Sequence, residues 1–210
     1  MILMSAVMVC GTASAQAQTA EPEPYVVYRV QTKDPVVFIT IDDGVYRSEA
    51  AMAEIRDLNW PVVHFLPPGM LRNDPSWFER FGEPVEFGNH SETHMRLKGR
   101  GFDIQKREIC QGATKVKSFV SGPITWLRPP YGVYDKTTVN AAKSCKMRHI
   151  VLWNVEVVEG RIHTWGGEVK RGDIILLHHR KELAGDLRAL ERKLRQLRLR
   201  PAVLSAYLDT

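Results

Sequence analysis

Acidic and histidine residues that could bind a metal ion follow short apolar runs in this chain. Asp42 and Asp43 directly follow the run 36–41, and His90 and His94 are four residues apart. On one helical turn this spacing places both imidazoles on one face, within reach of a single cation. Joined to a carboxylate from another strand, the two histidines form a His/His/Asp set that suits Zn²⁺ or a similar divalent ion and leaves positions for water and substrate. Such a set is typical of hydrolases.

Each of these patterns also has a simpler interpretation. Two acids before a glycine are usually a solvated turn, and two histidines at this spacing also occur by chance. The acids here lie at the mouth of an apolar strand, where a carboxylate without a partner is costly and a metal would offset that cost. The context therefore favours the metal site.

Other polar residues stand at the ends of later apolar runs. Arg128 is the last residue of the run 124–128, and Tyr131 follows three residues later. His178 directly follows the run 174–177. His178 is interpreted either as a catalytic group or as a core histidine whose hydrogen bonds are satisfied. Its neighbour His179 would point to the opposite side if strand alternation continues.

The elements that must position these residues alternate between strands and helices. Strands are predicted at 36–41, 62–66, 85–88, 124–128, 149–155, 173–178 and 202–208, and helices at 48–58, from Asp74-Pro75, at 103–120, at 135–145 and within 180–200. This alternation, with nearly continuous apolar strands, predicts an α/β fold with a parallel sheet covered by helices, either open or closed into a barrel. Active sites in such folds lie at the carboxyl ends of the strands, so the polar residues should converge. No glycine-rich phosphate loop follows the first strand, which argues against nucleotide binding.

The net charge of +5 lies in one segment. Residues 180–200 hold eight Lys or Arg and three Asp or Glu, while leucines recur at helical spacing. We interpret the segment as a helix with a solvated basic face, and we expect no nucleic-acid partner. After the N-terminal stretch no apolar run approaches 18 residues, so no membrane-spanning body and no stable membrane insertion are expected. Nothing in the sequence bears on the oligomeric state.

The first twenty residues are predicted to be a secretory signal peptide. They carry no charged side chain, and small residues suited to signal peptidase follow the apolar run 2–9. A basic segment is missing before that run, which leaves the true start codon open. Residues 21–32 are then a linker and 33–210 the folded domain, and the protein is secreted or associated with the cell wall. The mature chain would keep Cys110 and Cys145, either as a disulfide or as two separately buried thiols.

Taken together, the motifs resemble those of the polysaccharide deacetylases of carbohydrate esterase family four, the NodB-homology domain. In family order they are Thr40-Ile41-Asp42-Asp43-Gly44, His90-Ser91-Glu92-Thr93-His94, Arg128-Pro129-Pro130-Tyr131-Gly132 and Leu176-Leu177-His178. The resemblance covers about residues 33–208. It implies a distorted (β/α) barrel, in agreement with the seven strands expected here.

The resemblance also implies a role for each motif residue. Asp43, His90 and His94 would bind the divalent metal, Zn²⁺ or another ion such as Co²⁺. Asp42 would be the base, Arg128 would orient it, and His178 would be the acid. The backbone N–H of Tyr131 would hold the oxyanion, and the substrate site would contain Tyr131, Trp153 and Leu176.

The family's fourth motif, Asp-x-x-Asp-Trp, is altered in this chain. Glu156 and Glu159 stand at the acidic positions and Gly160 replaces the tryptophan. Either glutamate could orient His178, and Trp165 could supply the missing wall of the sugar site.

The sequence therefore predicts a secreted, metal-dependent hydrolase that deacetylates a polysaccharide. The expected substrate is β-1,4-linked N-acetylglucosamine in peptidoglycan or chitin. The alternatives are an O-acetyl esterase on xylan and a glycan-binding module with an impaired site.

Overall fold

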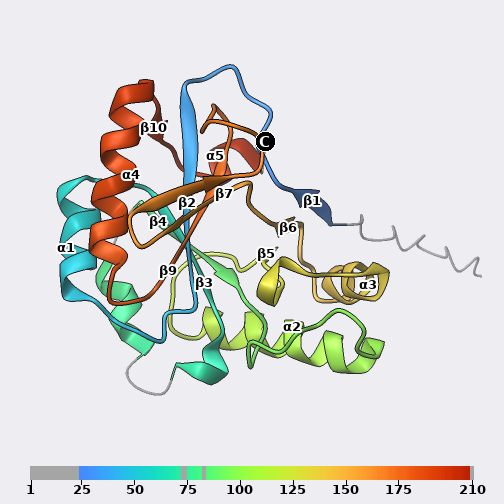
Figure 1. Ribbon diagram of the computed structural model, residues 1–210. Coiled ribbons are helices and arrows are strands. Elements are labelled where there is room, and N and C mark those ends of the chain that lie inside the picture. The colour runs from blue at the N-terminus through green and yellow to red at the C-terminus, as the bar shows by residue number, and fades with distance from the viewer. Residues whose placement is uncertain (1–23, 72–74, 82–83, 209–210) are drawn as a thin grey trace, which may run out of the picture.

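One curled sheet organises the computed structural model, which describes residues 24–71, 75–81 and 84–208 (Figure 1). The predicted signal peptide lies outside the described residues. The strands are β1 (Tyr25–Val27), β2 (Val36–Asp42), β3 (Val62–Leu66), β4 (Val85–Asn89), β5 (Trp126–Leu127), β6 (His149–Val151), β7 (Val155–Val158), β8 (Arg161–Thr164), β9 (Ile174–His178) and β10 (Arg200–Pro201). Their order is β1-β6-β5-β4-β3-β2-β9-β7-β8, with β10 also paired to β2. All described pairs are parallel except the β7–β8 hairpin.

The longer helices cover the outside of this sheet, whereas the short C-terminal helix packs against Phe38 on its inner side. The helices are α1 (Glu49–Asp57), α2 (Phe102–Lys117), α3 (Lys136–Ser144), α4 (Leu183–Leu197) and α5 (Ser205–Leu208), with a 3₁₀ helix at Pro75–Phe81 in place of the helix expected from Asp74-Pro75. Arg29, just after β1, forms a β-bridge with Asp173 at the start of β9, so the β1 edge folds back toward the other end of the sheet. This arrangement confirms the distorted (β/α) barrel.

Strand β2 is central because every one of its seven residues is buried. Alternate side chains face opposite sides of the strand. Ile39 and Ile41 pack in the cluster that includes the helix residues Met52 and Leu187, whereas Phe38 packs inside the barrel. An apolar run buried on both faces ends at Asp42, so the acids emerge at the carboxyl edge of the sheet.

Local signals predicted most helix boundaries. The Ser48 side chain accepts a hydrogen bond from the Ala51 N–H at 3.1 Å, which caps α1. The leucine face of α4 is buried, and its opposite face carries exposed ion pairs such as Arg188 with Glu54. This is the solvated basic face expected from the charge pattern. In the described part of the chain, no helix is long and apolar enough to cross a membrane.

Several elements differ from the sequence expectations. The region expected to be a linker, 21–32, includes strand β1. The single strand expected at 149–155 is interrupted: β6 ends at Val151 and β7 begins at Val155. Strand β6 pairs with β5, whereas β7 pairs with β9 on the other side of the sheet. Strand β8 was missed because it is an edge strand with exposed residues. The strand expected at 202–208 is helix α5, because the Glu86 carboxylate accepts the Leu204 N–H at 3.0 Å and satisfies the first turn.

A disulfide joins α2 to the end of α3. Cys110 and Cys145 are bonded, with Cα atoms 5.1 Å apart and a separation of 35 positions in sequence. A covalent link that closes a loop of this length restricts the unfolded chain. The two cysteines are therefore a pair rather than separate buried thiols.

The Cys110→Ser, Cys145→Ser double variant is expected to lose about 3–4 kcal/mol of unfolding free energy. Denaturant unfolding of the oxidised parent and of the variant measures this loss, and the reduced parent is the matched control. Two free thiols in the unfolded, unreduced parent would contradict the pairing.

Candidate active site

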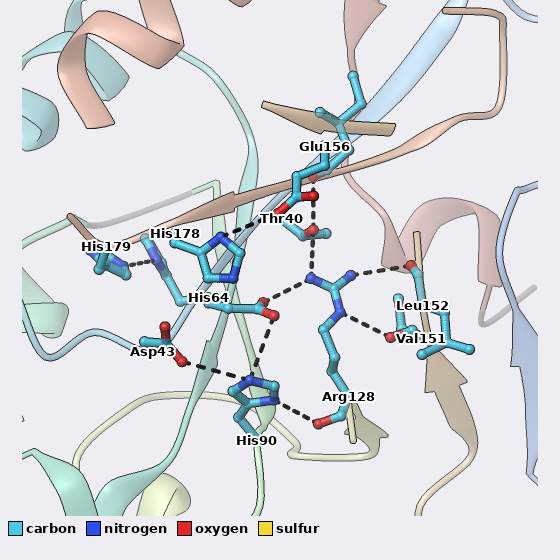
Figure 2. Close-up of polar contacts among 12 residues, drawn as sticks. Thr40, Asp43, His64, His90, Arg128, Val151, Leu152, Glu156, His178 and His179 are labelled. Atoms are coloured by element: carbon cyan, nitrogen blue, oxygen red, sulfur yellow. Dashed lines mark hydrogen bonds and ion pairs between the residues drawn. The ribbon is translucent and has the colours of Figure 1, made fainter. Parts of the chain in front are cut away.

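Three potential metal ligands meet at the carboxyl edge of the sheet. One ligand atom each from Asp43, His90 and His94 lies within 4.8 Å of the others. Asp43 Oδ1 is 3.3 Å from His94 Nε2. The same oxygen is 3.8 Å from His90 Nε2 (Figure 2). Asp43 follows β2 and His90 follows β4, so parallel pairing of neighbouring strands brings them together.

The two histidines reach this position without the helical turn that their spacing suggested. Residues 90–94 form a loop in which Ser91 and His94 have φ of 61° and 58°, and Asp43 has φ of 78°. This left-handed region is unfavourable for residues other than glycine. The loop geometry, not helix periodicity, aims both imidazoles at Asp43.

His90 is held in the form that binds a metal. Its Nδ1 donates to the Arg128 carbonyl oxygen at 2.7 Å, which leaves the lone pair of Nε2 toward Asp43. Burial lowers the pKa of His90, against the opposing effect of the Asp42 and Asp43 carboxylates. A neutral imidazole with its far nitrogen fixed is the usual metal-binding arrangement.

Asp42 is held by a fully buried arginine. Arg128 Nη1 donates to Asp42 Oδ1 at 2.8 Å, while Asp42 Oδ2 lies 3.6 Å from His90 Nε2. Burial lowers the pKa of Arg128, and Asp42 opposes that shift by its charge and its hydrogen bond. One carboxylate oxygen is therefore fixed and the other faces the potential metal ligands.

Further hydrogen bonds fix the arginine itself. Its other acceptors are Thr40 Oγ1 at 2.7 Å and the carbonyl oxygens of Val151 at 3.0 Å and Leu152 at 3.2 Å. The guanidinium also lies 4.3 Å from the centre of the Phe65 ring. Arg128 thus has one position, and it sets the orientation of Asp42.

His178 lies beside Asp42 on the neighbouring strand. The two are register partners of β9 and β2, and His178 Nδ1 is 4.0 Å from Glu156 Oε1 (Figure 2). Glu159 is exposed in the turn between β7 and β8. Of the two glutamates in the altered fourth motif, Glu156 is therefore the one beside His178.

His179 turns away from His178, as strand alternation predicted. Its Nε2 is 2.9 Å from Nδ1 of His64, a buried β3 residue in contact with Phe78 and Phe81. Burial lowers the pKa of His179 to about 3, and it also lowers that of His64. The pair is neutral core structure, and sequence reasoning missed it because the two residues lie 115 positions apart.

The residues expected around a substrate lie next to these groups. The Tyr131 ring is 4.9 Å from that of His94, and the residue has φ of 63°. Leu176 lies two residues before His178 on the same side of β9, facing the barrel interior. Trp153 packs against Gly132, where an added Cβ would lie 2.6 Å from the indole.

Sequence comparisons link the chain to known proteins. Residues 29–150 match the family model described as polysaccharide deacetylase. An uncharacterized protein of Streptomyces coelicolor is 33% identical over 88% of this chain and 76% of its own. A peptidoglycan-N-acetylglucosamine deacetylase of Bacillus cereus is 24% identical over 75% of this chain and 79% of its own.

Solved structures share the same fold. A peptidoglycan N-acetylglucosamine deacetylase superposes with a TM-score of 0.78 at 20% identity, over 90% of this chain and 94% of the other. A family 4 carbohydrate esterase from Bacillus anthracis gives a TM-score of 0.73 at 19% identity, over 95% of each chain. A family pseudoenzyme from the same species also gives 0.73, at 17% identity over 90% of this chain and 70% of the other, so fold alone does not establish activity. On the match to its family model and its 33% identical relative, the chain belongs to the polysaccharide deacetylase family.

Proposed function

We propose that this protein is a metal-dependent hydrolase that removes N-acetyl groups from β-1,4-linked N-acetylglucosamine in peptidoglycan or chitin. One observation carries the proposal: Asp42, held by Arg128, stands between a His/His/Asp ligand set and His178. A base, a metal site and an acid thus lie at one edge of the sheet. Relatives named as peptidoglycan deacetylases support the choice of substrate.

The donor set fits a divalent ion such as Zn²⁺ or Co²⁺. One carboxylate and two imidazoles are a common catalytic zinc set, and His90 is kept neutral as such a ligand must be. Asp43, His90 and His94 would hold the ion. When bound, it would polarise the acetyl carbonyl and lower the pKa of a water molecule.

Asp42 is placed to take the proton from the attacking water. Its Oδ1 is occupied by Arg128, which leaves Oδ2 as the free acceptor beside the ligand set. The Tyr131 N–H would donate to the carbonyl oxygen as negative charge develops there. Leu176 would contact the acetyl methyl group.

His178 completes the reaction. The bond from the carbonyl carbon to nitrogen breaks only if the amine is protonated, and the His178 imidazolium would supply that proton. The products are acetate and a free amine on the sugar. Glu156, whose Oε1 lies 4.0 Å from His178 Nδ1, is the carboxylate placed to orient this imidazole.

Glu156→Gln is therefore expected to lower kcat about tenfold and to leave KM unchanged, because the carboxylate nearest to His178 Nδ1 is lost as an orienting group. Acetate release from chitin oligomers measures both constants. Glu159→Gln is the matched control because Glu159 is exposed in the hairpin turn. An unchanged kcat in Glu156→Gln would mean that His178 has another partner.

An O-acetyl esterase is the second candidate, since the 4.0 Å contact supports His178 only loosely and an ester leaving group tolerates a weaker acid. A bifunctional xylanase/xylan deacetylase of Cellvibrio japonicus is 24% identical over 68% of this chain and 22% of its own. Acetate release from chitin oligomers, peptidoglycan and acetylxylan separates the candidates. Release from acetylxylan alone favours the esterase, and no release from any glycan favours the impaired glycan-binding module.

We also propose that the enzyme works outside the cytoplasm, secreted or associated with the cell wall. The Cys110–Cys145 disulfide supports this, because such bonds persist in oxidising compartments. The proposed polymeric substrate lies there too.

A further inference from the structure

An aromatic groove adjoins the proposed active site. It has a volume of about 360 Å³, and its walls include Tyr28, Tyr131, Trp153, Asn154 and Trp165. Tyr131 joins the groove to the metal ligands, because its ring lies 4.9 Å from that of His94. The groove therefore continues directly from the place where the acetyl group would react.

Three aromatic side chains in the walls of the groove are exposed to solvent. Trp165 is 66% exposed, Tyr131 62% and Tyr28 49%. No residue that lines the groove has a charged side chain. Exposed aromatic rings beside a catalytic site mark a binding surface, and the lack of charge points to a neutral ligand.

The segments that carry these rings are fixed to one buried carboxylate. Asp173 accepts hydrogen bonds from Arg29 Nε at 2.6 Å and from Asn154 Nδ2 at 2.7 Å. Arg29 follows Tyr28 in sequence, and Asn154 follows Trp153. The Trp165 N–H donates to the Asn154 carbonyl oxygen at 3.2 Å. Three separate segments are thereby held together, so the groove is formed before any ligand binds.

We propose that this groove is a saccharide subsite for the neutral pyranose ring next to the sugar that is deacetylated, with Trp165 and Tyr28 as stacking faces. A pyranose presents apolar C–H faces and a rim of hydroxyl groups. An indole or phenol ring matches the apolar face, and its polar edge matches the rim. Trp165 lies at the far end of β8 from Gly160, which stands where the family motif has tryptophan. The inference rests on the proposed deacetylase function, because it identifies the bound chain as the substrate.

Trp165→Ala and Tyr28→Ala are each expected to raise KM for the N-acetylglucosamine tetramer about 5- to 10-fold and to leave kcat unchanged. The same variants should leave KM for the N-acetylglucosamine monomer within about twofold, because a single sugar fills only the reacting position and does not reach the added subsite. Tyr25→Ala is the matched control: Tyr25 lies three residues before Tyr28, is 71% exposed and does not line the groove. It should match the parent on both substrates.

Two results would overturn the subsite while leaving the deacetylase intact. One is an unchanged KM for the tetramer in both variants of an active enzyme. The other is an equal rise for monomer and tetramer, which would place these rings at the reacting sugar itself. Calorimetric binding of the tetramer to the Asp42→Asn variant, with and without Trp165→Ala, needs no turnover. This binding measurement tests the groove even if the parent releases no acetate. Absence of acetate release would refute the proposed function alone. Equal affinity for the tetramer with and without Trp165→Ala would overturn the subsite.

Discussion

Asp43→Asn, His90→Ala and His94→Ala should each lose the bound metal and acetate release together. Only three protein ligands meet at the site within the described residues, so the loss of one leaves too few to hold an ion. Activity is expected to fall at least about a thousandfold, because the polarised carbonyl and the activated water are lost at once. Metal content of the purified variants and acetate release from chitin oligomers measure both effects.

His163→Ala is the control for the histidine variants, since His163 is exposed on β8. It should retain metal and activity. Full acetate release from His90→Ala or His94→Ala would contradict the ligand assignment. A parent protein that binds no divalent ion would contradict the whole mechanism.

Asp42→Asn is expected to keep the metal and lose at least about a hundredfold in kcat, the usual scale of general-base catalysis. The asparagine oxygen can still accept from Arg128, so the geometry survives while the proton acceptor is lost. The contrast with Asp43→Asn is the informative result, because Asp42 is assigned the role of general base and its neighbour Asp43 that of metal ligand.

The checks on Asp42→Asn are metal content, which should equal that of the parent, and circular dichroism, which should show an intact fold. Asp57→Asn, at the exposed end of α1, is the surface control. Near-full acetate release from Asp42→Asn would remove Asp42 from the role of base and strengthen the glycan-binding alternative.

The sequence predicted the site best where a strand alone positions the residue. Asp42 and His178 close apolar strands, and parallel pairing must bring such strand ends to one edge. The approach of Asp43 to His90 followed from the same rule. No local pattern indicates the left-handed loop around His94, because its backbone depends on contacts from elsewhere in the fold.

Elements that depend on distant partners escaped sequence reasoning. Helix α5 is capped by Glu86, 118 residues before Leu204, and β1 exists because β6 pairs with it. The choice between Glu156 and Glu159 likewise required the β7–β8 hairpin, which places one beside His178 and the other in the turn. Local patterns contain no information on such pairings.

The left-handed backbone at Asp43, His94 and Tyr131 lowers the stability of the fold at the site itself. Each such conformation costs about 1–3 kcal/mol for a residue other than glycine. Glycine would remove that strain, yet it would also remove a proposed ligand at two of these positions and an aromatic ring at the third. Selection for stability alone would therefore replace the residues that the proposed chemistry needs most. The unfolding free energy lost at these positions must come from interactions in the rest of the barrel.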